Sequence, residues 1–109
     1  MNVRLYVWQR ITATLMVPLI VIHLAVMIYA IRGGLSAGEI LGRTRGSIVW
    51  ALFYGSFVLL AAVHGAIGVR SVLGEWTRLR GRSLDLLMWG FGTALVLLGL
   101  RAVVAVVVP

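Results

Sequence analysis

Three long stretches of apolar residues constrain this chain more than any other feature of its sequence. They run from Ile11 to Ile31, from Ser47 to Val69 and from Leu84 to Val108. Each is longer than the ~20 residues with which a helix crosses the hydrocarbon core of a membrane. The apolar share of the chain is 61%, whereas soluble domains have about 45–50%. The sequence predicts an all-α integral membrane protein, a single domain over 1–109 with transmembrane helices at about 11–31, 47–70 and 84–108.

Two further properties of the sequence exclude common alternatives. The first apolar stretch is longer than the ~7–15 residues of a signal-peptide core, so we expect a transmembrane helix there. The chain has no cysteine, which excludes thiolate-bound iron–sulfur clusters, disulfides and thioether-attached haem in this chain. Any haem bound here would therefore be non-covalent and ligated by histidine.

The ten basic residues are all arginines, and their distribution predicts the orientation in the membrane. Six belong to the N-terminal segment and the loop between the second and third helices: Arg4, Arg10, Arg70, Arg78, Arg80 and Arg82. Four belong to the opposite side: Arg32, Arg43, Arg45 and Arg101. The positive-inside rule places the N-terminus in the cytoplasm and the C-terminus outside. These charges suit anionic lipid headgroups or a soluble partner on the second loop, and not a nucleic acid, because they form no continuous patch.

Short signals predict where helices bend, begin and pack. Pro18 cannot donate a backbone hydrogen bond and should kink the first helix. Ser36-Ala37-Gly38-Glu39 has capping-box spacing, which predicts a short interfacial helix to about Leu41. Ser83 is expected to cap the third transmembrane helix, with Asp85 complementing its dipole. The spacing of Ala61 and Gly65 suits close packing of the second transmembrane helix, and Gly92 and Gly99, seven residues apart, lie on one face of the third.

The two histidines are the strongest candidates for a functional site. An ionisable side chain within a membrane helix is costly and marks a functional site by default. His64 lies near the end of an apolar stretch, and Gly68 removes a side chain one turn away, so a flat ligand such as haem would lie close to the helix. His23 lies roughly 10 Å deeper, at 1.5 Å of rise per residue.

Because axial ligands of one haem face each other across the iron, His23 and His64 of one chain are poorly placed to share one. Either each histidine ligates a different haem together with another chain, or His64 alone is a ligand and His23 is structural. Zinc is disfavoured, because no further ligand lies at suitable spacing from either histidine. Arg10 and Arg70, near the inner interface, are candidates for contacts with haem propionates or quinone oxygens.

Two motifs resemble those of a known family. His64-x3-Gly68-Val69-Arg70-x4-Glu75 closely resembles the His-x3-Gly-Ile/Leu-Arg-x4-Asp signature of membrane anchors of succinate dehydrogenases and fumarate reductases. Gln9-Arg10-Ile11-Thr12-Ala13 resembles the His-Arg-x-Ser-Gly opening of their first helix. Length and three-helix plan also match, so the resemblance covers essentially the whole chain.

The resemblance implies a non-catalytic subunit of an oxidoreductase complex. In the family, a flavoprotein with covalent FAD oxidises succinate, an iron–sulfur subunit passes electrons to quinone, and the anchor binds haem b and builds the quinone pocket. His64 would be the axial ligand of the inner haem, Arg70 would lie near the propionates, and Arg10 at the quinone site or the propionates. Glu75 and Trp76 would border the quinone. Trp76 replaces the usual Tyr and can only donate a hydrogen bond, so an interfacial role is the alternative.

His23 departs from single-haem anchors and matches anchors that bind two haems. The resemblance then implies a second three-helix unit that completes the ligand pairs, a sister subunit or a second copy of this chain. We expect the membrane anchor and haem b subunit of a succinate:quinone oxidoreductase in a bacterial cytoplasmic membrane. The rival hypotheses are a haem-free packing subunit of a larger membrane complex and a transporter subunit in which both histidines relay protons.

Overall fold

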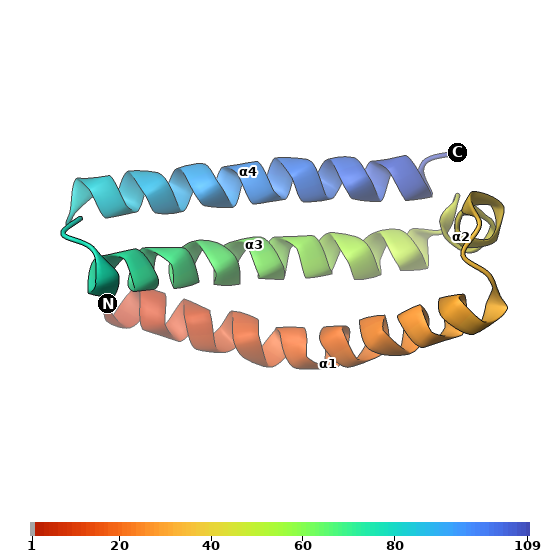
Figure 1. Ribbon diagram of the computed structural model, residues 1–109, viewed down its shortest axis with the longest axis horizontal. Helices are drawn as coiled ribbons and strands as arrows, with labels where there is room; N and C mark the ends of the chain where they lie inside the picture. Colours follow the sequence, from red (N-terminus) through yellow and green to blue (C-terminus); the bar gives the residue numbers. More distant parts are fainter. Residues whose placement is uncertain (1) are drawn as a thin grey trace.

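The computed structural model describes residues 2–109, which form four α-helices (Figure 1). They are α1 (Val3–Gly33), α2 (Ala37–Thr44), α3 (Ile48–Trp76) and α4 (Arg82–Val107). Helices α1, α3 and α4 are long and apolar enough to cross a membrane, and no strand occurs within residues 2–109. The prediction of an all-α protein with three membrane-spanning helices is confirmed.

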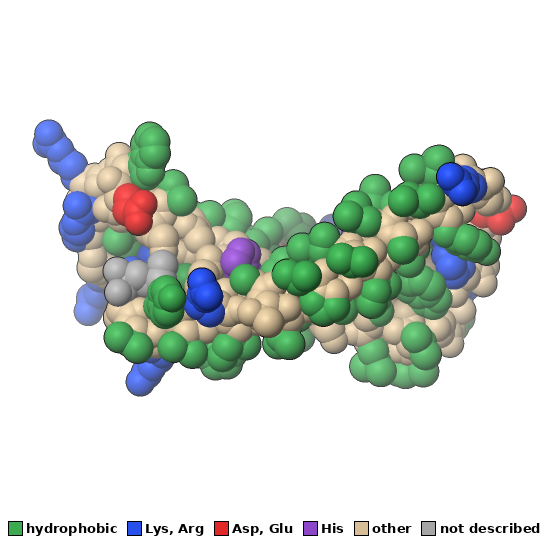
Figure 2. All heavy atoms as spheres, turned by 90° about the horizontal axis from the view of Figure 1, so that it is seen from below, with side chains coloured by type: hydrophobic (Ala, Val, Ile, Leu, Met, Phe, Trp, Pro, Cys, Tyr) green, Lys and Arg blue, Asp and Glu red, His purple; other side chains and the backbone are tan. Residues whose placement is uncertain are grey.

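The three long helices form one layer, with α3 in the middle, α1 against one side and α4 against the other (Figure 1). The N-terminus and the α3–α4 turn lie at one end of the layer, and α2 and the C-terminus lie at the other. The principal extents are 48 × 23 × 22 Å. The long axis exceeds the ~30 Å of a hydrocarbon core, so both ends reach the polar interfaces. Arginines gather at these ends, with apolar side chains covering the face between them (Figure 2).

Helix α1 begins eight residues before the apolar stretch that predicted it. The side chain of Asn2 caps it by accepting a hydrogen bond from the backbone N–H of Leu5 at 2.9 Å. Hydropathy marks the part of a helix that suits hydrocarbon, whereas the helix itself begins at its cap. The helix continues through Pro18 and is bowed along its length (Figure 1).

The caps of α2 and α3 are serines, as expected for helix starts. The Ser36 side chain accepts from the N–H of Glu39 at 3.2 Å, which confirms the predicted start of α2. The Ser47 side chain accepts from the N–H of Trp50 at 3.3 Å at the start of α3. Helix α2 extends to Thr44, three residues beyond the predicted end at Leu41.

The predicted cap of α4 is wrong. Helix α4 already begins at Arg82, so Ser83 lies within its first turn, and no side chain caps the helix. The N-cap residue is Gly81, whose φ of 59° lies in the left-handed region that glycine adopts without steric cost. The tight turn after α3 therefore determines where α4 begins. Asp85 does lie in the first turn, as predicted.

Small residues bring α3 and α4 together. A Cβ placed on Gly92 would lie 3.1 Å from the Cβ of Ala66, and one placed on Gly99 would overlap the side chain of Val58. Both glycines, which the sequence placed on one face of the helix, thus face α3, and backbones approach closely at such positions. Because most large apolar side chains remain exposed, the layer presents its hydrophobic surface outward, as a membrane protein does.

Candidate functional site

A hydrogen bond between Thr12 of α1 and His64 of α3 joins the two helices in the half that contains the N-terminus and the α3–α4 turn, called the inner half here because the charges predict that it faces the cytoplasm. Thr12 is only 1% exposed, and its Oγ1 lies 3.3 Å from the Nδ1 atom of His64. The same hydroxyl lies 2.9 Å from the carbonyl oxygen of Trp8 and 3.1 Å from that of Gln9. The imidazole of His64 is therefore held through one ring nitrogen, and its Nε2 atom is left for another partner.

A buried amide lies against Gly68, one helical turn from this histidine. The Oε1 atom of Gln9 is buried and forms no hydrogen bond within residues 2–109. The Nε2 atom of Gln9 faces Gly68, 3.4 Å from where a Cβ of that residue would stand. A buried polar atom without a partner costs free energy, and in native proteins it commonly points to a missing ligand or partner. The niche formed by Gln9, Thr12, His64 and Gly68 is called the inner niche below.

His23 has a different environment, in the outer half of the same interface. Its ring is perpendicular to those of Phe57 and Tyr54 of α3, with centroid distances of 5.4 and 6.3 Å. Phe53 and Trp50 extend this group of rings along α3. Within residues 2–109, His23 is positioned by these aromatic contacts and forms no hydrogen bond.

The partners of the two histidines set their separation along the membrane normal. His64 lies opposite Thr12, whereas His23 lies opposite Tyr54 and Phe57, seven to ten positions earlier in α3 than His64. At 1.5 Å of rise per residue, this offset is about 10–15 Å. The structure brings the two histidines to one interface but to different levels.

Arg70 forms an ion pair with Asp85 across the inner end of α3 and α4. Its Nε atom lies 2.9 Å from Oδ1 of Asp85, with the two side chains 19% and 52% exposed. The interaction uses Nε and leaves the two terminal nitrogens of the guanidinium without a hydrogen bond inside residues 2–109. Arg70 also lines a polar cleft of about 320 Å³ with Ser71, Glu75 and Arg80.

The remaining candidates lie at the surface of the inner end. Arg10 is exposed, and its guanidinium lies 5.9 Å from the centroid of the Tyr6 ring. Glu75 is exposed, and Trp76 is 83% exposed at the last residue of α3. In the described part of the chain, no hydrogen bond or ion pair connects Arg10 with Glu75, Trp76 or Arg70. These residues share one end of the molecule without forming a closed site.

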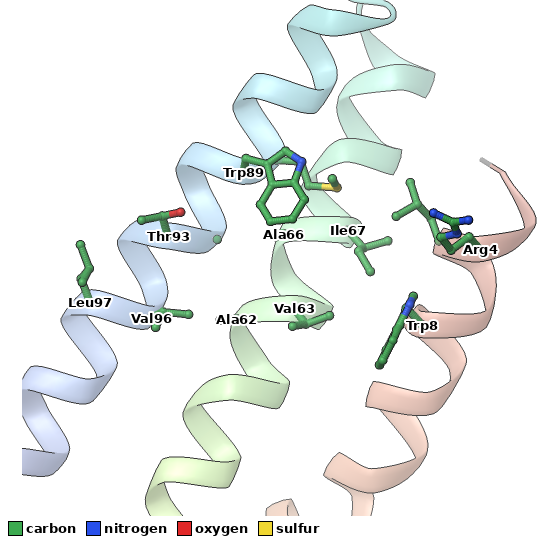
Figure 3. Close-up of a pocket in the computed structure, with 13 residues that line it drawn as sticks. Arg4, Trp8, Ala62, Val63, Ala66, Ile67, Trp89, Thr93, Val96 and Leu97 are labelled. Carbon is green, nitrogen blue, oxygen red and sulfur yellow. The ribbon is translucent and has the colours of Figure 1, made fainter.

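An apolar cavity of about 510 Å³ opens near the inner end, between all three long helices. Trp8 and Arg4 of α1 and Trp89 of α4 flank it, with Ala62 and Ala66 of α3 at its back (Figure 3). His64 does not line this cavity. The cavity and the inner niche are therefore separate features.

Sequence reasoning missed two members of the inner niche, Thr12 and Gln9. Both belong to the second of the two motifs, Gln9 to Ala13, but neither was assigned a role. A signal was available, because a threonine and a glutamine at the start of an apolar helix each carry a polar group that needs a partner when buried. The pairing of Arg70 with Asp85 was also missed, because Asp85 was assigned to the helix dipole alone.

The architecture defines a class, the three-span α-helical membrane protein with an imidazole between two of its helices. A family model described as succinate dehydrogenase/fumarate reductase transmembrane subunit matches residues 1–107. The chain belongs to this family, which confirms the resemblance seen in the two motifs. Membership implies a complex with other subunits. No curated protein and no solved structure matches the chain.

Proposed function

We propose that this chain binds haem b and, with an iron–sulfur subunit, transfers electrons to quinone as the membrane anchor of a succinate:quinone oxidoreductase. The observation that carries the proposal is the hydrogen bond of Thr12 to Nδ1 of His64. Histidines that bind a metal through one ring nitrogen generally donate the other ring N–H to a fixed acceptor, which sets the tautomer and orientation. A histidine that only joined two helices would form the same hydrogen bond, so what favours a ligand at His64 is its Nε2 atom, which has no hydrogen-bond partner within residues 2–109.

The residues around His64 fit a haem. Its Nε2 is available for iron, and the neighbouring helix surface is apolar apart from the amide of Gln9, whose Oε1 lacks a partner. Arg70 uses only Nε toward Asp85, so its terminal nitrogens would bind a propionate, with Arg10 as the second donor at the same end. The amide of Gln9 lies over Gly68, so this side chain would have to turn aside for a haem to lie against the helix there. A haem held there supplies one-electron redox chemistry, and the protein tunes its potential through the ligands and the apolar shell.

The quinone would bind at the inner end, next to the incoming iron–sulfur subunit. Arg10, Glu75 and Trp76 are exposed there, so they are accessible to a partner subunit and to a lipid-soluble substrate. Arg10 and the indole N–H of Trp76 are hydrogen-bond donors, suited to quinone carbonyl oxygens. A partner subunit would have to close this site, because the four helices alone leave it open.

We further propose a second haem at the outer level, with His23 as its ligand from this chain. The separation of about 10–15 Å from His64 supports two ligand levels. The second axial ligand at each level would come from another three-helix unit, a sister subunit or a second copy of this chain. Such a partner would cover apolar side chains that the single layer leaves exposed.

The distribution of charges supports a proposed orientation. The end that holds the N-terminus and the α3–α4 turn carries the larger group of arginines, which favours the cytoplasmic side of a bacterial membrane. The flavoprotein, with FAD, and the iron–sulfur subunit would then dock at this end. Lipid headgroups would contact the arginines that the partner subunits leave uncovered.

The proposal is tested by a reduced-minus-oxidised and pyridine haemochrome spectrum of the complex purified through this chain, normalised to flavin. We expect haem b in the native complex, and we expect His64→Ala to remove at least one haem while membrane insertion is retained. Val63→Ala, which shortens the adjacent exposed side chain, is the matched control and should keep the native haem content. A native complex without haem would contradict the proposal and leave a packing subunit. Unchanged haem content in His64→Ala would contradict the ligand assignment.

A further inference from the structure

We propose that Thr12 is a positioning residue that sets the tautomer, the orientation and the electron donation of the His64 imidazole. The inference rests on the proposed function, because it assumes that His64 is an iron ligand. It starts from the burial of Thr12, whose side chain is 1% exposed although it carries a hydroxyl group. A buried hydroxyl in the hydrocarbon region needs hydrogen-bond partners. The neighbours of the Thr12 hydroxyl belong to different chemical groups.

The hydroxyl has one proton and three neighbours within hydrogen-bond distance. Two are backbone carbonyl oxygens, of Trp8 at 2.9 Å and Gln9 at 3.1 Å, and these can only accept. The third is Nδ1 of His64 at 3.3 Å. A threonine within a helix commonly donates to the carbonyl three or four residues earlier, and here those distances are the shorter ones. The Thr12 hydroxyl therefore donates its proton to the carbonyl oxygens, and a lone pair of the hydroxyl oxygen faces His64.

The histidine must then be the donor of the interhelical bond. Nδ1 carries the proton, and Nε2 has a free lone pair, because a neutral imidazole has one of each. The bond also fixes the rotation of the ring, since α1 and α3 hold both partners in place. A ring N–H bonded to an acceptor makes the opposite nitrogen a more basic ligand. A more basic ligand favours ferric iron, so the bond lowers the midpoint potential of the haem at His64.

Thr14 offers a matched control on the same helix. Its hydroxyl donates to the carbonyl of Arg10 at 2.8 Å, as that of Thr12 does within α1, but Thr14 is exposed and does not contact His64. Thr14→Val removes the same chemical group without touching the imidazole. Thr12→Ser keeps the hydroxyl and loses one methyl group, so it serves as the conservative variant.

The experiment is a redox titration of the purified whole complex, with electron paramagnetic resonance of the ferric haem. The signal to follow is the haem component that is missing from His64→Ala. We expect Thr12→Val to shift the midpoint potential of this component to more positive values, to change its resonance positions and to lower haem affinity by about tenfold. Thr12→Ser and Thr14→Val should match the native protein. If Thr12→Val does not assemble, Thr12→Ala removes the same hydroxyl with less change in shape.

Two results would overturn the role of Thr12. One is a native potential and resonance spectrum in Thr12→Val and Thr12→Ala. The other is an equal shift in Thr14→Val. In either case, loss of the component in His64→Ala would still support the proposed function. A haem content that is unchanged in His64→Ala would instead contradict the ligand assignment, and the role of Thr12 would fail with it.

Discussion

The two halves of the α1–α3 interface hold an imidazole in different ways. In the inner half, His64 is fixed by a hydrogen bond to a buried threonine, next to the amide of Gln9. In the outer half, His23 lies against the edges of aromatic rings, and residues 2–109 provide it with no hydrogen bond. One ring nitrogen of the inner imidazole forms a hydrogen bond, whereas neither ring nitrogen of the outer one has a hydrogen-bond partner among the described residues.

Two histidines on the same interface are therefore held by different kinds of contact, and this affects how each could bind a ligand. A hydrogen bond determines which nitrogen carries the proton, whereas ring packing determines position only. A ligand at the outer level would therefore need an acceptor from elsewhere for the second nitrogen of His23, and a neighbouring subunit is the natural source. The inner level has its acceptor within the chain.

The strongest test of the comparison is to remove the outer histidine. We expect His23→Ala to eliminate one of two haems and to leave the component assigned to His64 at its native potential, because the two levels are separated by about 10–15 Å. The measurement is the haem-to-flavin ratio together with a redox titration. Ile22→Ala, a change at the adjacent exposed position, is the control. A native complex with a single haem that persists in His23→Ala would make His23 structural.

The distance between α3 and α4 also varies along their contact. Alanine substitutions at three glycines of α4 measure this variation. Gly99→Ala overlaps the branched side chain of Val58, which cannot turn aside because its Cβ is also close, so we expect about 1–3 kcal/mol of destabilisation. Gly92→Ala should cost less, since the nearest atom lies at 3.1 Å. Gly90→Ala has open space and should gain up to ~1 kcal/mol from helix propensity.

Thermal denaturation of the complex in detergent, followed by loss of the haem spectrum, gives the order of the three variants. Equal melting temperatures for Gly99→Ala and Gly90→Ala would contradict the close approach at Val58. A larger loss of stability in Gly92→Ala than in Gly99→Ala would contradict the inference that α3 and α4 approach more closely at Gly99 than at Gly92.

The smallest expected effect concerns the ion pair at the inner end. The pair of Arg70 and Asp85 is partly exposed, so Asp85→Asn should cost less than about 1 kcal/mol in stability. Arg70→Gln removes the same pair and, in addition, the proposed donor to the haem propionates. We therefore expect a lower haem-to-flavin ratio in Arg70→Gln than in Asp85→Asn. Equal ratios would restrict Arg70 to its structural role.

Much of the fold was predictable because hydrocarbon imposes a simple length requirement. The three apolar stretches predicted three helices, and the spacing of Gly92 and Gly99 predicted that they share one face of α4 but not which helix that face contacts. The helix ends were less predictable. The apolar stretch begins at Ile11 and does not reveal the segment before it, in which α1 begins at its cap. The start of α4 is determined by the left-handed turn at Gly81 and not by the hydroxyl of Ser83.

Single residues of the candidate site could be predicted from the sequence, but their arrangement in space could not. His64 and His23 stand out because ionisable groups are rare in such stretches. The partners Thr12 and Gln9 lie about fifty positions away in the chain, and only the antiparallel packing of α1 on α3 brings them to His64. Likewise, no spacing rule connects Arg70 with Asp85, because their pairing depends on how α4 returns along α3.

The contact of the outer loop with α4 has a consequence for the order of assembly. Thr44 donates to the carbonyl of Val106 at 2.7 Å, and the N–H of Gly46 donates to that of Val107 at 2.6 Å. Both acceptors belong to the end of α4, which is synthesised long after the loop. Before the last helix has crossed the membrane, the loop lacks these two acceptors, and the Thr44 hydroxyl has the carbonyl of Ile40 within α2 as its partner. These two contacts can form only after α4 is made, so we expect the loop to be more exposed to protease in half-inserted chains than in finished ones.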